Sequence, residues 1–158
     1  MSETTRREIL GTAAWAAPAA LLGVAAVGRA GDPTSRRRTV GGSPNPAFSR
    51  AVGFGGIVYV AGVIGRKPGT TGAITESFEE QCRHSLDAMK ASVEAAGSSL
   101  SHVLKCTCFL TDVNDFAAFN KIFMEYFASD PPARSTVVVK ALVVPGARIE
   151  IDCVTCVD

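Results

Sequence analysis

An arginine that follows a proline turn is the first residue of this sequence whose type and position suit it to binding or catalysis. Arg134 comes after Pro131 and Pro132, which cannot sit inside a strand, and it opens a β-branched run. This order predicts that Arg134 lies at the mouth of a strand, where its guanidinium can hold a carboxylate through two parallel hydrogen bonds. A Pro-Gly loop then leads to a neighbouring strand with Glu150, a carboxylate able to handle a proton or a water molecule. The alternative interpretation of the two charges is a structural ion pair.

Two ordered motifs around these charges carry a family resemblance. P-A-R-S at 132–135 and I-E-I at 149–151 resemble the C-terminal motif of the RidA/YjgF family of enamine and imine deaminases. The resemblance covers about residues 41 to 158, and it implies a chorismate-mutase-like fold assembled as a homotrimer with clefts between its subunits. It also implies hydrolysis of 2-aminoacrylate-type enamines and imines to 2-keto acids and ammonia, without a cofactor. Arg134 matches the family arginine that binds the substrate carboxylate, and Glu150 matches the glutamate that positions or activates water.

The same resemblance implies a set of substrate-binding residues. Gly62 interrupts a β-rich run, as glycine does at a bulge or where a ligand comes close, and in the family this region lines the ligand pocket. Phe48 stands where many members have tyrosine, and it can pack against a ligand but cannot donate a hydrogen bond. Thr136 stands where some relatives have cysteine. Asn120 matches a residue near the pocket of relatives, and Ser135 belongs to the P-A-R-S motif.

The first thirty residues are typical of an export signal. Two consecutive arginines, Arg6 and Arg7, precede a mildly apolar run rich in alanine and glycine, a pattern that resembles a bacterial twin-arginine (Tat) signal. The alternative is a retained membrane anchor, which the glycines and the proline of the run disfavour. We therefore expect a periplasmic or secreted protein with a Tat-type signal peptide at 1–30, a linker at 31–46 and a RidA-like domain at 47–158.

The charge balance argues against nucleic acids and membranes as partners. The chain has 16 basic and 15 acidic residues, and removal of residues 1–30 leaves 13 of each (16 − 3 and 15 − 2). A neutral domain has no electrostatic attraction for nucleic acid or for anionic lipid, so a ribonuclease activity fits poorly. The expected partners are a small carboxylate-bearing substrate and, as the resemblance implies, further copies of the chain.

The hydrophobic pattern predicts two long helices and several strands. Apolar residues recur at spacings of three and four between Ser77 (or Thr75), which can cap a helix, and Gly97, which ends it. A second helix is predicted at about 115–128, and strands are predicted before the first helix and at 102–112, 136–143 and 148–154. Each amphipathic helix needs a sheet to cover. The order therefore predicts an α+β fold, a mixed β-sheet with two helices packed on one face.

Five cysteines raise the question of a metal or redox site. Cys106 and Cys108 are close in sequence, as are Cys153 and Cys156. Residues three apart on a strand point to opposite faces, so Cys153 and Cys156 do not chelate one ion if their strand continues. Buried cysteine acting as a small hydrophobe is the better interpretation, and no metal is expected.

Two functional hypotheses follow from the sequence. The first is an exported enamine/imine deaminase, which the presence of both Arg134 and Glu150 favours. The second is a non-catalytic trimeric binder of small carboxylates or ketoacids that uses Arg134 as an anchor, because one fold can serve both roles.

Overall fold

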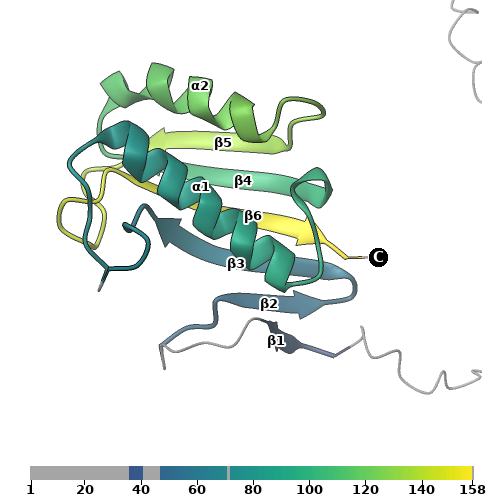
Figure 1. Cartoon of the computed structure of the whole chain (residues 1–158). Coiled ribbons are helices and arrows are strands. Elements are labelled where there is room, and N and C mark those ends of the chain that lie inside the picture. Colours follow the sequence, from purple (N-terminus) through teal and green to yellow (C-terminus); the bar gives the residue numbers. More distant parts are fainter. Residues whose placement is uncertain (1–35, 41–46, 71, 158) are drawn as a thin grey trace, which may run out of the picture. The chain divides into compact units, whose positions relative to one another are not determined.

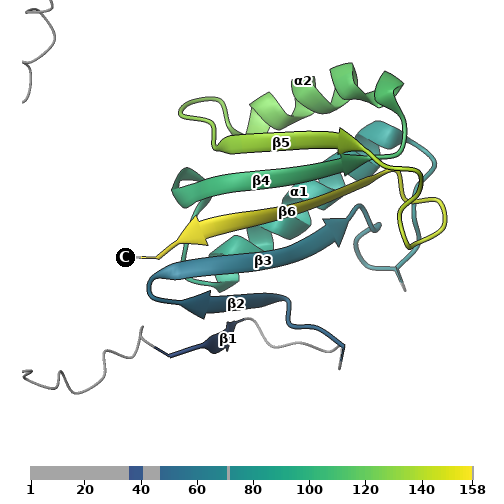
Figure 2. The same ribbon diagram turned by 180° about the vertical axis from the view of Figure 1, so that it is seen from behind.

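In the described part of the chain, six strands form one mixed sheet, and two α-helices cover one of its faces (Figures 1 and 2). The computed structural model describes residues 36–40, 47–70 and 72–157, so the expected signal peptide at 1–30 and most of the expected linker lie outside the described residues. The expected α+β fold with both helices on one face is confirmed. The elements are β1 (Arg38–Val40), β2 (Ala51–Phe54), β3 (Ile57–Ile64), α1 (Phe78–Ala95), η2 (Leu100–His102), β4 (Val103–Leu110), η3 (Val113–Asp115), α2 (Phe116–Tyr126), β5 (Ala133–Val138) and β6 (Ile149–Cys156).

The strand order β1-β2-β3-β6-β4-β5 is not the order of the sequence. β2 and β3 form a hairpin through Gly55 and Gly56, whose positive φ angles of 60° and 80° are those that a two-residue hairpin turn requires. β6 enters the middle of the sheet and pairs antiparallel with both β3 and β4. β5 is an edge strand that runs parallel to β4, with α2 as the crossover between them.

The first helix forms as its pattern predicts. The Ser77 side chain accepts a hydrogen bond from the Glu80 backbone N–H (3.3 Å), and two glutamates occupy the positive end of the helix. Gly97, just past the end, has φ 82°, a left-handed value that glycine adopts without strain. The buried stripe faces the sheet and consists of Phe78, Cys82, Leu86, Met89 and Val93.

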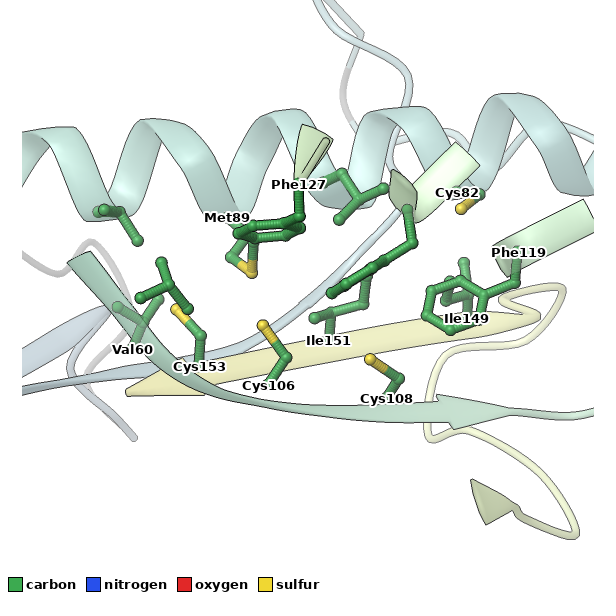
Figure 3. Packing of buried hydrophobic residues seen from close by; sticks show 14 of the residues in the cluster. Val60, Cys82, Met89, Cys106, Cys108, Phe119, Phe127, Ile149, Ile151 and Cys153 are labelled. Atoms are coloured by element: carbon green, nitrogen blue, oxygen red, sulfur yellow. The ribbon is translucent and has the colours of Figure 1, made fainter. Parts of the chain in front are cut away.

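The core lies between the helices and the sheet, and it is rich in sulfur (Figure 3). Cys82 on α1, Cys106 and Cys108 on β4, and Cys153 on β6 are buried and unpaired, whereas Cys156 is half-buried. Burial is the main cause that raises the pKa of each of the four buried thiols to about 12. These four cysteines therefore act as small hydrophobes. Among the described residues, no three His, Cys, Asp or Glu side chains gather closely enough to hold a metal ion.

The structure differs from the sequence-based expectation at two strands. Arg38–Val40, within the expected linker, form β1 and pair with β2, so the sheet begins before residue 47. β5 starts at Ala133 and ends at Val138, earlier than the expected 136–143, so Arg134 is the second residue of the strand and lies at its beginning. The Val139 N–H still donates to the Leu110 carbonyl at 2.8 Å, but β4 ends at Leu110 and the strand pairing stops there. Within the described part of the chain, no helix is long and apolar enough to span a bilayer.

The thiols provide a test of the core. At pH 8, a thiol with a pKa of about 12 is ionised to about one part in ten thousand, and the thiolate is the form that reacts. We therefore expect a disulfide reagent such as Ellman's reagent to label only Cys156 in the native protein and all five cysteines after unfolding. Mass spectrometry identifies the labelled sites, and Cys156→Ser should abolish the native reaction. Rapid native labelling of any buried cysteine would contradict this packing.

Candidate active site

Arg134 is held over the aromatic face of α2. In the parallel register Arg134 lies beside Cys106, whose side chain is in the core, so Arg134 projects from the sheet face that the helices cover. Its guanidinium carbon lies 4.9 Å from the Phe119 ring centre and 4.7 Å from that of Phe123. An Nη2–H group donates to the Asn120 side-chain oxygen at 2.6 Å. The stacking and the amide fix the guanidinium without neutralising it.

The sequence predicts the two residues that follow Arg134 as substrate-binding residues. The structure places these two, Ser135 and Thr136, on opposite faces of the sheet. Thr136 projects from the same face as Arg134, and its buried hydroxyl has no hydrogen-bond partner among the described residues. Ser135 projects from the opposite face, where its hydroxyl accepts a hydrogen bond from Lys105 Nζ at 2.6 Å. Thr136 is therefore placed to act with Arg134, and Ser135 is not.

A cavity of about 590 Å³ lies beside residues 61–64 of β3. This end of the strand extends beyond Val60, the last β3 residue that pairs with β2. Three residues expected from the sequence, Phe48, Gly62 and Glu150, line this cavity together. Arg50 and Arg66 also line it, and the sequence analysis missed both. The sequence signal that could have identified Arg50 and Arg66 is that they lie close to Phe48 and Gly62 along the chain. The other lining residues are Ala61, Val63, Ile64, Ala88, Ala91, Ser92, Val143 and Val144.

The Gly62 backbone and the Glu150 side chain lie close together. The register of β3 against β6 shifts between Val60 and Val63, so Gly62 lies in a β-bulge. A Cβ atom built on Gly62 would overlap Glu150 Oε1. Glycine at this position therefore leaves the space in which the Glu150 carboxylate lies.

The start of β6, and with it Glu150, is held in place by a buried amide. Gln81 on α1 donates to the Thr75 carbonyl (2.7 Å) and to the Gly146 carbonyl (3.0 Å), and its oxygen accepts from the Arg148 backbone N–H (2.8 Å). The Arg148 guanidinium also pairs with both carboxylate oxygens of Asp115, at 2.6 and 2.8 Å. The sequence analysis missed Gln81, because a glutamine on the buried face of a helix gives no sign of its partners.

Arg134 and Glu150 do not meet within one chain. The sequence suggested that their strands are neighbours, but β4 lies between β5 and β6. On β4, Glu150 pairs with Phe109, and Arg134 pairs with Cys106. Side chains alternate between the two faces along a strand, and these two β4 residues are three positions apart, so they point to opposite faces. The side chains of Glu150 and Arg134 therefore also project from opposite faces of the sheet. This geometry also excludes the structural ion pair within one chain.

Residues 42–157 match the family described as endoribonuclease L-PSP. The chain belongs to this family. A 2-iminobutanoate/2-iminopropanoate deaminase from Dermatophagoides farinae is 37% identical over 118 residues, which cover 73% of this chain and 91% of that protein. The protein of the same name from Homo sapiens is 36% identical, with coverage of 68% and 77%.

Solved structures agree with this assignment. The YjgF gene product from E. coli superimposes with a TM-score of 0.69 and 32% identity, over 75% of this chain and 98% of that one. RidA from an Antarctic Psychrobacter species gives a TM-score of 0.69 and 34% identity, over 76% and 99%. The resemblance to the RidA/YjgF family inferred from the two motifs is thus confirmed.

Gly62 in β3 and Gly65 just after it allow a matched test of the close contacts at this end of the strand. In Gly62→Ala the nearest atoms to the new Cβ all belong to the flexible Glu150 side chain, so we expect the carboxylate to move and stability to fall by less than about 1 kcal/mol. Gly65→Ala meets the Gln81 backbone inside α1, which cannot move aside, so we expect a loss of about 1–3 kcal/mol. Urea unfolding measures both, and a crystal structure of Gly62→Ala locates Glu150. Equal losses of stability in the two variants would contradict the conclusion that Gly62 faces a movable side chain and Gly65 a fixed helix backbone.

Proposed function

We propose that this protein is an enamine/imine deaminase, which hydrolyses 2-aminoacrylate-type enamine and imine acids to 2-keto acids and ammonia. The observation that carries the proposal is the position of the Arg134 guanidinium. Among the described residues, the groups that hold it are neutral: the Asn120 amide and the Phe119 and Phe123 rings. Its charge therefore remains available for a carboxylate. The relatives named as imine deaminases, at 36% and 37% identity, support the same activity.

The active site is proposed to form between subunits of a homotrimer. Because Arg134 and Glu150 project from opposite faces of one sheet, one small substrate reaches both only if the two residues come from different chains. The sheet face without helices supports this assembly, since it has large apolar side chains that no described residue of the same chain covers. Tyr59 is 58% exposed, Phe54 57% and Val137 45%, and a second copy of the chain would bury such a surface.

The chemistry needs only positioning and proton transfer. Arg134 holds the substrate carboxylate, and an enamine first takes a proton on its terminal carbon to become the imine. Water then adds to the imine carbon while Glu150 accepts its proton, and the C=N bond becomes a single bond. Glu150 returns this proton to the nitrogen, and the proton of the new hydroxyl group is then also transferred to the nitrogen. The C–N bond breaks, and ammonia leaves as the carbonyl forms. One water is consumed for each ammonia released, and no electrons are transferred.

Single substitutions test the two roles. We expect Arg134→Ala to lose the catalysed reaction by about a hundredfold or more, because the substrate is no longer oriented, and Arg134→Lys to lose less. Glu150→Ala should also be inactive. Imines are generated in situ by an amino-acid oxidase, and keto-acid release is measured against semicarbazide as the competing trap. No acceleration by the folded wild-type protein with any imine would leave the non-catalytic carboxylate binder as the better hypothesis.

Mixed trimers test the location of the site. A co-expressed mixture of Arg134→Ala and Glu150→Ala chains should regain about a quarter of wild-type activity, because one interface in four then combines an intact arginine with an intact glutamate. The double variant mixed with wild type provides the control for subunit exchange. Failure of the inactive pair to recover, in trimers shown to be mixed, would contradict a shared site.

Export through the Tat pathway is also proposed. It is supported by Arg6 and Arg7 before the apolar run, and by the four thiols of the core. Tat carries proteins already folded in the cytoplasm, so these thiols would be buried before they meet an oxidising compartment. We expect replacement of both arginines by lysine to retain the protein in the cytoplasm, as measured by cell fractionation in a Tat-competent bacterium. Export of the lysine variant at the wild-type level would refute the route.

A further inference from the structure

Two arginines line the cavity that contains Glu150, and the proposed mechanism uses neither. Arg50 and Arg66 are both exposed. Among the described residues three ion pairs occur, and none of them involves these two arginines or Glu150. Two guanidinium groups that line one concave surface, with no carboxylate in the described part of the chain paired to either, provide a site for an anion.

The backbone at the end of β3 fixes where these arginines lie. The Arg50 carbonyl accepts a hydrogen bond from the Ala61 N–H at 2.9 Å, directly beside the bulge at Gly62. Arg66 forms a β-bridge with Ile74, and its Nη1–H group donates to the Gly72 carbonyl at 2.6 Å. This bond occupies one edge of the Arg66 guanidinium and leaves its other N–H groups for a ligand.

The cavity is larger and more positive than a 2-aminoacrylate-type substrate requires. Such a substrate has three carbons and one carboxylate, which Arg134 is proposed to hold. A volume of about 590 Å³ is in the range of sites for much larger ligands. Its only charged lining residues are Arg50, Arg66 and Glu150, so the described wall has an excess of positive charge.

We infer that the preferred substrates are imine acids with a second carboxylate on the side chain, such as the imines of glutamate and aspartate. Arg50 and Arg66 hold the side-chain carboxylate, while Arg134 of the other subunit holds the carboxylate next to the imine carbon. The reaction is unchanged: the imine and one water give a 2-keto dicarboxylic acid and ammonia. This inference rests on the proposed function and specifies the substrate class of the same site.

Matched pairs of imines test the inference. Oxidases that accept glutamate, glutamine, aspartate and asparagine generate imines that differ mainly in the side-chain charge, and the full chain is assayed with semicarbazide competition. We expect kcat/KM for each acidic imine to exceed that for its amide counterpart by about tenfold or more, as a charge-assisted contact provides.

Variants then assign the preference to the cavity. Arg50→Gln and Arg66→Gln should each lower kcat/KM for the acidic imines by about tenfold and leave the amide imines within about twofold. Arg37→Gln is the control, because this exposed arginine lies outside the cavity, and it should alter neither. Thermal unfolding of each variant shows whether its fold is retained.

The outcomes separate this inference from the proposed function. Turnover of amide imines with no preference for acidic ones overturns the inference and leaves the deaminase intact. An equal loss for acidic and amide imines in both variants also overturns it, because the arginines then act on the site in general. No acceleration with any imine sinks the proposed function itself.

Discussion

The alternation of side chains across β4, β5 and β6 is the constraint on which the rest of this structure depends. The two described helices cover the same face of the sheet, so each strand residue belongs either to this core side or to the side that the helices leave bare. Arg134 falls on the first and Glu150 on the second. A shift of either strand by one residue would exchange its faces, which would expose core residues to water. Burial of the core and separation of the two charged groups are thus consequences of a single register.

The local elements were predictable because their signals are local. The capping serine, the buried stripe and the terminal glycine of α1 lie within a stretch of about twenty residues, and each has a direct physical meaning. The two charged residues of the proposed site were singled out from the sequence, because their motifs are short and ordered. Fold class followed from the order of the helices and strands.

What the sequence analysis missed depends on contacts between distant segments. The insertion of β6 between β3 and β4 is a pairing choice that no local pattern encodes, and it separates the strands of Arg134 and Glu150. Gln81 contacts residues 65 and 67 positions away along the chain. Arg50 and Arg66 become notable only once the end of β3 forms the wall of a cavity. In each case the residue type gave no sign of its neighbours, because folding selects them from the whole chain.

The bonds of Gln81 divide the connection between β5 and β6 into two parts with different freedom to change. From Gly146 onward, the backbone is tied to α1 through the amide of Gln81 and to Asp115 through Arg148. Before Gly146, Val143 is 93% exposed and lines the cavity. Substitutions, insertions or deletions in this earlier part can therefore reshape one wall of the cavity while Glu150 keeps its position. The connection provides a place where the shape of the cavity can evolve separately from the proposed catalytic carboxylate of Glu150.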